Sequence, residues 1–428
     1  MVANRPSLSS PEQRLAQGHV IRSTLMGTLS KDMVTGPFLV AFAVQVVGFS
    51  NGQLSLMLSL LPLVIVLRYP VLDRIRVHPR RSVTLVARAI QLTCLLLLAI
   101  LPQAWITLPV LTGIAILFVI GNEFLQNAVW TNLVAEVSAR GDRGRFLGRL
   151  RTGKQATALA FALFGFLYVG DQLDRQEHRV LLAIVILLLL NSAFWLSRMP
   201  SAPPPDEVRR FSGRGRFWHT LRTSPLLRRP LVLLLINGVL HWPILNVYLL
   251  GTLNMPANLL MLNVVAGMLG PIFSVFLWGR SADALGERRI YRIYFVGALT
   301  LYPMLLLVPD FDAVTPGGRD WTIGLTALLM FNFLMGILDA GQLMAASMYQ
   351  SRYVTAGSGF HAINILTMAG QLFMSVLTAV GGLLLATGTT GAATAWGPLW
   401  IDIFRIATIA IVTATIVLGL AVANGIED

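Results

Sequence analysis

The sequence predicts an all-α polytopic membrane protein with twelve transmembrane helices in two pseudo-symmetric six-helix bundles. Of its 428 residues, 55% are hydrophobic and only 12% are charged, whereas soluble domains carry about 25% charged residues. Several apolar runs reach about 18 residues, the length that a helix needs to cross the hydrocarbon core of a bilayer. The basic residues also gather in alternate loops, as expected of a chain that crosses a membrane many times.

Twelve apolar windows, separated by charged or Pro/Gly-rich breaks, define the predicted spans. The windows are 23–48, 53–72, 82–101, 107–136, 150–170, 180–198, 230–251, 255–278, 290–308, 321–349, 358–386 and 397–423. Residues 1–198 form the predicted N-terminal bundle, and residues 230–428 form the C-terminal bundle. Residues 199–229 contain Pro203, Pro204 and Pro205 near their start and continue as a basic stretch, which predicts a cytoplasmic linker with an interfacial helix. A solvated linker without such a helix is the alternative.

The basic residues also predict the orientation of the chain. Of the 33 Lys and Arg residues, 26 lie in the tail and in loops on one side, and only Arg175, Arg179 and Arg319 lie in loops on the other. The positive-inside rule therefore places both termini in the cytoplasm, with the chain in the cell inner membrane or an intracellular membrane derived from it. The net charge of +13 is then a topology signal that includes contact with anionic lipid, and nucleic acid is not an expected partner.

The two halves of the sequence repeat one pattern. Asp73 follows span 2 and Asp283 follows span 8, 210 positions later. Glu123 in span 4 and Asp339 in span 10 are 216 positions apart, and each is followed three residues later by a glutamine. Two six-helix halves related by such a repeat are a recurring plan of secondary transporters.

Two loop motifs resemble those of a known family. The run G-R-S-A-D-A-L-G-E-R-R at 279–289 resembles the loop between the second and third helices of each half in the major facilitator superfamily, and 73–81 resembles a degraded copy. The run R-G-R-F-L-G at 143–148 resembles the stretch between helices 4 and 5 of that family. The resemblance covers essentially the whole chain. It implies that family's fold, a transport function, and a central cavity lined by helices 1, 4, 7 and 10. Residues 155–170 lack the proline-glycine motif of many drug–proton antiporters, which argues against a drug exporter.

The charged residues of these loops are predicted to form a cytoplasmic gate. An aspartate near a helix N-terminus interacts favourably with the helix dipole, and neighbouring arginines can pair with it or bridge adjacent helix ends. The alternative is that these residues only set the topology and cap helices. The predicted gating residues are Asp73, Arg74, Arg80, Arg81, Arg143, Arg145, Arg280, Asp283, Arg288 and Arg289.

Polar residues inside the spans are the candidates for a substrate and proton cavity, because a charge at bilayer depth is costly and usually serves a function. They gather on spans 1, 4, 7 and 10, the four helices that the resemblance places around the cavity. The candidates are Lys31, Asp32, Glu123, Gln126, Asn127, Trp130, Asn237, His241, Tyr248, Asn332, Asp339 and Gln342.

Several of these residues have alternative interpretations. Glu123 is predicted to be the principal functional carboxylate, since it lies near the middle of its span. Lys31 could instead pair with Asp32 or extend toward the membrane surface, and Asp339 could serve the gate. A structural role is favoured for Arg68, Arg88, His361 and Arg405, which lie near span ends or on helices that do not line the cavity.

These residues predict a secondary active transporter that moves a small molecule or an ion by alternating access. Glu123 or Asp339 could exchange protons with His241 as a relay; sodium coupling and simple facilitation stay open. One alternative is a divalent metal or organic cation transporter of the same fold. Another is a non-transporting assembly factor or receptor, favoured if Lys31 and Glu123 form a pair in a sealed cavity. Beyond the substrate and the lipid bilayer no partner is expected, and the chain is predicted to be a monomer.

An enzyme is not expected. Residues 148–155 nearly match a phosphate-binding loop, but Gln155 replaces the required Ser or Thr and no strand precedes the run. No nucleophile–base pair or cysteine–histidine zinc motif is recognisable. The single cysteine, Cys94, lies in an apolar run, so a disulfide-rich scaffold is excluded. No cofactor or metal is predicted.

The topology can be tested by cysteine labelling from outside intact cells. We expect 140–151 and 203–229 to face the cytoplasm, and 171–179 and 310–320 to face outward. A cysteine introduced at Gly317 should therefore react with a membrane-impermeant maleimide, whereas one at Gly213 should react only after the cells are opened. Labelling at Gly213 in intact cells would contradict the assignment.

Overall fold

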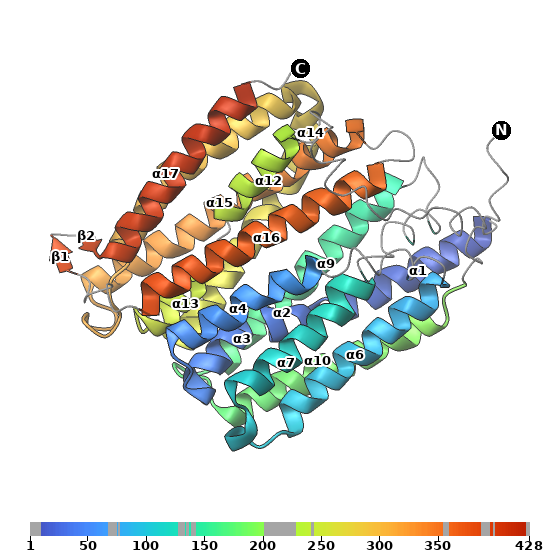
Figure 1. Ribbon diagram of the computed structural model, residues 1–428, viewed down its shortest axis with the longest axis horizontal. Helices are drawn as coiled ribbons and strands as arrows, with labels where there is room; N and C mark the ends of the chain where they lie inside the picture. Colours follow the sequence, from blue (N-terminus) through green and yellow to red (C-terminus); the bar gives the residue numbers. More distant parts are fainter. Residues whose placement is uncertain are drawn as a thin grey trace. The chain divides into compact units, whose positions relative to one another are not determined.

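The computed structural model describes residues 10–66, 75, 78–126, 133, 137, 143–200, 228–240, 244–353, 359–386, 394–396 and 399–424. Within these residues the regular secondary structure is helical apart from one short hairpin (Figure 1). Each of the twelve predicted spans contains a helical segment among the described residues. The predicted all-α, polytopic fold class is therefore confirmed.

The first half of the chain contains several interrupted helices. Spans 1 and 4 each continue from α-helix into a π-helix, and span 1 is also broken near Gly27 and Gly36. The elements are α1 (Ser10–Gly27), α2 (Leu29–Thr35), α3 (Pro37–Ala41), η1 (Phe42–Val47), α4 (Asn51–Val66), α6 (Arg80–Ile100), η2 (Gln103–Trp105), α7 (Leu108–Val119), η3 (Ile120–Gln126), α9 (Arg143–Tyr168) and α10 (Arg175–Ser197).

The second half contains longer helices. Its elements are α12 (Arg228–Leu240), α13 (Ile244–Gly251), α14 (Ala257–Leu301), η6 (Tyr302–Leu307), α15 (Arg319–Tyr353), α16 (Gly359–Ala386), β1 (Thr394–Trp396), β2 (Leu399–Ile401) and α17 (Ile403–Asn424). The two strands pair antiparallel, with Ala395 opposite Trp400.

Counted over the described residues, eight helical stretches are long and apolar enough to cross a membrane: Arg80–Ile100, Arg175–Ser197, Leu231–Gly251, Ala257–Trp278, Leu285–Leu307, Arg319–Ala346, Met368–Ala386 and Ile403–Asn424. Of Leu231–Gly251, residues 241–243 lie outside the described residues. Asn51–Val66 and Leu108–Glu123 are apolar but shorter. Spans 1 and 5 are not among these helices, for reasons that the structure shows. Span 1 is divided among short helices, and α9 carries five basic residues between Arg143 and Lys154.

The predicted starts of spans 6 and 12 were wrong, because capping residues rather than hydrophobicity set them. The helix of span 6 starts at Arg175 instead of residue 180: Asp174 accepts a hydrogen bond from the Glu177 backbone, and Glu177 accepts one from the Asp174 backbone, which is a capping box. The helix of span 12 starts at Ile403 instead of residue 397. Asp402 accepts the backbone N–H of Arg405, and the apolar residues before it form β2.

The break expected over 279–289 is narrower in the structure. Residues 257–285 are helical, and the helix is interrupted at Gly286, where φ is 71°. This left-handed conformation suits glycine and strains residues that have a Cβ atom. The phosphate-loop-like run at 148–155 lies inside α9, so it does not form the strand–loop–helix arrangement that such loops require.

The chain divides into two compact units. Unit 1 contains 1–42, 63–161 and 174–215, and unit 2 contains 43–62, 162–173 and 216–428. Most residues of the predicted linker, 201–227, lie outside the described residues. The division into bundles at 199–229 therefore stays a prediction.

Unit 1 is built around α1, α6 and α10, which lie side by side (Figure 1). The buried apolar residues at one end are Ala16, Val20, Leu133, Val137, Phe146, Leu196 and Met199. Farther along, the Ser23 and Ser192 hydroxyls are 3.0 Å apart, and Ser192 also donates to the Ser23 carbonyl. Interhelical hydrogen bonds between small polar residues are a usual way to join helices in membranes.

Unit 2 contains segments from both halves of the sequence. Asp171, which precedes α10, accepts hydrogen bonds from the backbone of Ala257 and the side chain of Asn258 at the start of α14. Ser375 of α16 donates to the Ser59 carbonyl of α4. These contacts join span 2 and the end of span 5 to helices of the second half within unit 2.

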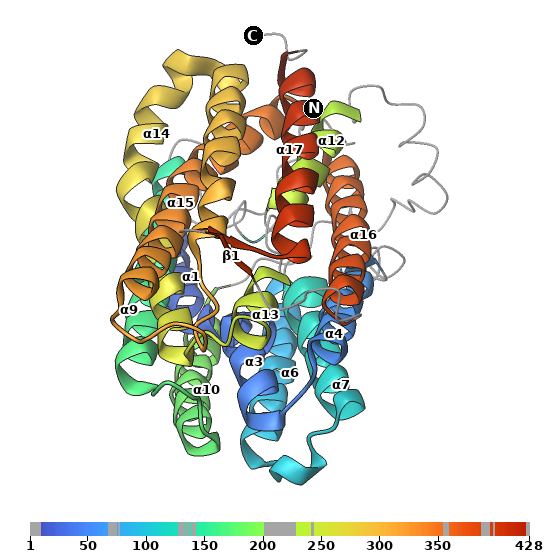
Figure 2. The same cartoon turned by 90° about the vertical axis from the view of Figure 1, so that its left-hand side faces the viewer.

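Glycines let α14 and α15 pack closely in unit 2, where the two helices lie side by side (Figure 2). A Cβ atom at Gly336 would lie 2.4 Å from the carbonyl oxygen of Gly267 and 2.7 Å from Cδ of Pro271. A Cβ atom at Gly270 would lie 2.2 Å from the Phe333 carbonyl oxygen. Small residues at such contacts let backbones approach and replace the hydrophobic driving force that lipid does not provide.

We expect Gly336→Leu to destabilise the protein, because its side chain would meet backbone that cannot move aside. Overpacking typically costs about 1–3 kcal/mol, so the midpoint of thermal unfolding in detergent should fall. The control is Gly113→Leu in α7, since a Cβ atom there meets nothing within 4 Å. Equal unfolding midpoints for the two variants would contradict this account of the α14–α15 contact.

Candidate functional site

An ion pair joins two of the predicted cavity residues in unit 1. Nζ of Lys31 in α2 lies 3.1 Å from Oε1 of Glu123 in η3. The Lys31 side chain is 58% exposed, and the Glu123 side chain is 19% exposed. The sequence left two other positions open for Lys31, beside Asp32 or extended toward the membrane surface. The structure brings it to Glu123.

The backbone around this pair is irregular on both sides. Glu123 lies in a π-helical segment, a conformation that is rare and occurs frequently at functional sites. The neighbouring Asn122 also donates to Oε1 of Glu123, at 2.9 Å. Lys31 follows the break between α1 and α2. These interruptions place two donors from different spans on one carboxylate oxygen.

Two buried residues of α6 extend the network behind the pair. Gln91 donates from Nε2 to Oδ1 of Asn122 at 3.2 Å. Arg88 donates from Nη1 to Oε1 of Gln91 at 2.8 Å and to the Gly27 carbonyl at 3.3 Å. Arg88 is 3% exposed and Gln91 is 0% exposed. The sequence analysis favoured a structural role for Arg88 and did not single out Gln91 or Asn122. The charge of Arg88 inside an apolar helix was the one feature of the sequence that could have pointed to this network.

Two further charged residues act on the pair through space. Asp32 of α2 interacts electrostatically with Lys31 and with Lys154 of α9, and Lys154 also interacts with Arg88 and Glu123. Counting these groups as ionised, three cations face two carboxylates. The cluster therefore has a surplus of positive charge.

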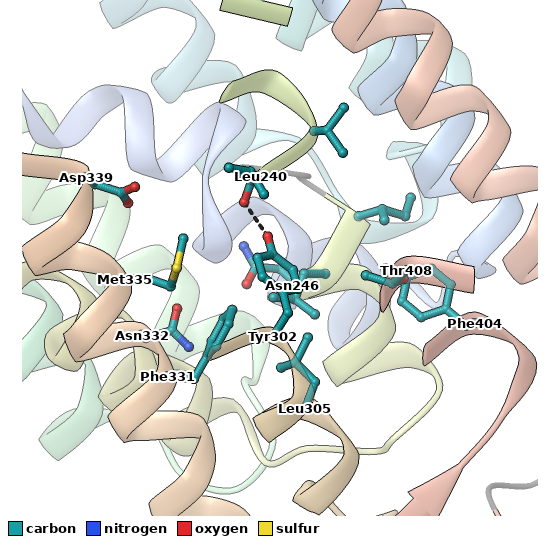
Figure 3. A pocket seen from close by; sticks show the side chains of 13 residues that line it. Leu240, Asn246, Tyr302, Leu305, Phe331, Asn332, Met335, Asp339, Phe404 and Thr408 are labelled. Carbon is teal, nitrogen blue, oxygen red and sulfur yellow. Dashed lines mark hydrogen bonds between the residues drawn. The ribbon is translucent and has the colours of Figure 1, made fainter. Parts of the chain in front are cut away.

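A separate cavity of about 250 Å³ lies inside unit 2 (Figure 3). It contains two predicted site residues, Asn332 and Asp339 of α15, and Figure 3 shows them on the same side of the space. Tyr302 donates to the Leu240 carbonyl at 2.6 Å across the cavity wall, and the Tyr302 and Phe331 rings meet edge to face. The remaining lining residues are Val239, Ile244, Leu245, Asn246, Leu305, Met335, Phe404 and Thr408.

Asn332 also contacts Asn263 of α14, donating from Nδ2 to Oδ1 at 2.7 Å. Asn263 is buried and was not among the predicted site residues. Gln342, which was predicted, is 7% exposed. Gln342 is not among the residues that line the cavity.

Tyr248 belongs to a different group of side chains in unit 2. Its hydroxyl contacts Asp402 and accepts a hydrogen bond from Nε of Arg405 at 2.7 Å. Arg405 also lies 3.2 Å from Asp402 and donates to the Trp400 carbonyl at 2.7 Å. Both charged side chains are at most 2% exposed. This cluster ties α13 to β2 and the start of α17, which fits the structural role favoured for Arg405.

Most of the other predicted site and gating residues lie wholly or in part outside the described residues. Arg81 donates to the Met199 carbonyl at 3.2 Å, Arg80 and Arg288 are half-buried, and Arg289 is exposed. Asn127, Trp130, His241, Asp73 and Arg74 lie outside the described residues, as do the side chains of Gln126, Asn237, Arg143, Arg145, Arg280 and Asp283. The cytoplasmic gate thus stays a prediction.

Comparisons with known proteins give matches in structure alone. No protein-family model matches the chain, and no curated protein matches it by sequence. The nucleoside transporter NupG matches with a TM-score of 0.63 and 11% identity, covering 97% of this chain and 100% of NupG. The inward-open xylose transporter XylE from E. coli matches with a TM-score of 0.66 and 12% identity over 94% of each chain. A D-xylose–proton symporter matches with a TM-score of 0.67 and 13% identity, over 95% of this chain and 97% of the symporter.

Each of these three structures is a transporter, and each is matched along nearly its whole length. Identities of 11–13% establish the architecture and leave the substrate undetermined. The chain is a multi-pass membrane protein with the fold of the major facilitator superfamily transporters, as its sequence motifs predicted.

Proposed function

We propose that the protein is a proton-coupled secondary transporter that moves a small solute by alternating access. The observation that carries the proposal is the pair between Lys31 and Glu123, which joins spans 1 and 4 in unit 1. A charged pair at bilayer depth is costly to keep unless it is used or compensated. The fold, and the proton coupling named for the D-xylose–proton symporter, support the same conclusion.

The coupling follows from the chemistry of the two side chains. When Glu123 accepts a proton, it loses the charge that holds Lys31, and the ammonium group becomes available to another acceptor. When Glu123 releases the proton, the carboxylate regains Lys31 and displaces that acceptor. Proton and solute therefore bind together and leave together, which is symport.

The surplus positive charge around the pair indicates what kind of solute would replace Glu123. With Lys31, Arg88 and Lys154 facing Asp32 and Glu123, protonation of Glu123 leaves three cations beside one carboxylate. A group that carries negative charge gains most in such a field. We therefore propose a solute with an acidic group, and the Asn332 amide in the unit 2 cavity is a further candidate for substrate contact.

The exposure of Lys31 bears on the non-transporting alternative. That alternative would be favoured by a sealed pair, yet the Lys31 side chain is 58% exposed. An exposed Lys31 side chain argues against a sealed pair and so supports transport. No observation on the described residues favours a metal or organic cation as substrate.

Proteoliposomes loaded with a pH-sensitive dye test the proposal. We expect external lactate to drive protons into the vesicles, whereas D-xylose and uridine, which carry no acidic group, should not. Proton uptake with D-xylose or uridine but not with lactate would support transport and reject the acidic substrate. Lactate entry without any proton movement would reject the coupling.

In the same assay, Glu123→Gln should abolish proton movement, because the amide cannot exchange a proton and holds Lys31 only weakly. Any remaining solute exchange should lose its dependence on external pH. The matched control is Asp320→Asn, an exposed carboxylate at the start of α15, which should keep the wild-type flux. A wild-type pH profile for Glu123→Gln, at equal protein levels, would show that this carboxylate is structural.

A further inference from the structure

We propose that Arg88 and Gln91 are positioning residues for Glu123 and that they link the charge of Glu123 to the break in helix 1. Neither residue lines the unit 2 cavity or belongs to the Lys31–Glu123 pair. The inference deepens the proposed function, on which its significance for transport rests. Its structural part can be tested without any substrate.

The hydrogen bonds form one continuous chain through the interior of unit 1. From Arg88 the chain passes to Gln91 (2.8 Å), to Asn122 (3.2 Å) and to Glu123 (2.9 Å). Lys31 reaches the same Glu123 oxygen from the other side, at 3.1 Å. Three spans of the first half, spans 1, 3 and 4, thus meet at one carboxylate.

The direction of every bond in this chain is determined by its two ends. A guanidinium group can only donate, so Gln91 must turn its carbonyl oxygen toward Arg88. Its amide nitrogen then faces Asn122, which must present its own oxygen there and its nitrogen to Glu123. All donors therefore point toward the carboxylate. Such an aligned chain strengthens its members and stabilises the negative charge at its end.

Arg88 also binds the backbone at the break in helix 1, the interruption between α1 and α2. Its Nη1 atom donates to the Gly27 carbonyl, which accepts a second bond from the Ser30 hydroxyl at 2.9 Å. The last carbonyls of a helix have no partner within the helix, so these donors satisfy the end of α1. A Cβ atom at Gly27 would lie 2.3 Å from Nη2 of Arg88, and glycine is therefore needed for the guanidinium to fit.

The backbone from Gly27 to Lys31 in span 1 completes a ring of contacts, because Arg88 binds Gly27 at one end and Glu123 binds Lys31 at the other. One route from the break to Glu123 runs through Arg88 and the two amides, and the other runs along the backbone to Lys31. Protonation of Glu123 weakens both routes at once, since Lys31 and Asn122 donate to the same oxygen. The break in helix 1 then loses its fixed connection to span 4.

The charged groups around Glu123 come from three packed elements. They are Lys31 and Asp32 of α2, Arg88 of α6, and Lys154 of α9. Replacing Gln91 or Asn122 by an apolar residue changes none of these four charges. A change in the titration of Glu123 on removal of Gln91 or Asn122 can therefore be assigned to the hydrogen-bonded chain.

The experiment follows the carboxyl band of Glu123 by infrared spectroscopy of the purified full-length protein across pH, with the band identified by its loss in Glu123→Gln. We expect Gln91→Met and Asn122→Leu, which keep the side-chain shape and remove the hydrogen bonds, each to move the titration midpoint up by about one pH unit. Because the two amides form one chain, the double variant should show no larger shift than Asn122→Leu alone.

Asn263→Leu in unit 2 is the matched control, since it removes another buried amide that bonds to an asparagine. It should leave the midpoint unchanged. Additive shifts in the double variant, or no shift in either single variant, would overturn the positioning role. If Gln91→Met does not fold, Arg88→Lys, which keeps the charge but cannot span both acceptors, should give a shift in the same direction.

A spin label at Thr28, in a chain whose Cys94 is replaced by serine, tests the link to helix 1. Its mobility should change over the pH range in which the Glu123 band titrates, and this change should disappear in Gln91→Met. Constant mobility in the otherwise wild-type chain would reject the link. A shifted band in a protein that moves no solute would instead reject the proposed function and keep the positioning role.

Discussion

The cost of a charge inside a membrane is the constraint that shapes unit 1. An isolated charge at bilayer depth costs at least about 2.5–3.5 kcal/mol, and Lys31, Glu123 and Arg88 lie on three different spans. Each is stabilised by the others or by amides between them. The breaks near Gly27 and the π-helix at Ile120–Gln126 are the backbone adjustments that bring these groups within hydrogen-bonding distance.

Unit 2 meets the same constraint in a different way. Asp402 and Arg405 lie three residues apart at the start of one helix, so their pairing requires no other span, and Tyr248 and the Trp400 carbonyl complete the group. A local pair of this kind can fix a helix end without depending on how spans are arranged. A pair between two spans, such as Lys31 and Glu123, depends on that arrangement and can respond to its change.

This difference also explains what the sequence could predict. Hydrophobicity alone pointed to a helical segment for each of the twelve spans, although it misplaced two of their starts. The depth of Glu123 identified a carboxylate that the structure places in a network. The partner of Lys31 could not be chosen, because the rotation of one helix against another is set by packing and not by periodicity within either. The role of Gln91 could not be predicted for the same reason. It depends on the hydrogen bond to Asn122 of a neighbouring helix. The start of α17 was misplaced because apolar residues of β2 resemble a helix in a hydropathy window.

The low sequence identity to solved transporters follows from the difference between apolar packing and specific polar contacts. Lipid-facing and core positions accept many apolar residues, so the fold persists at 12% identity, whereas each polar connection needs particular donors and acceptors. A function is therefore better sought in those connections than in the fold. In this chain Oε1 of Glu123 accepts donors from both Lys31 and Asn122. A single proton on that carboxylate weakens the direct contact to Lys31 of α2 and the hydrogen-bonded chain that runs through Asn122 to Gln91 of α6. A small chemical change thereby gains a route to a large conformational one.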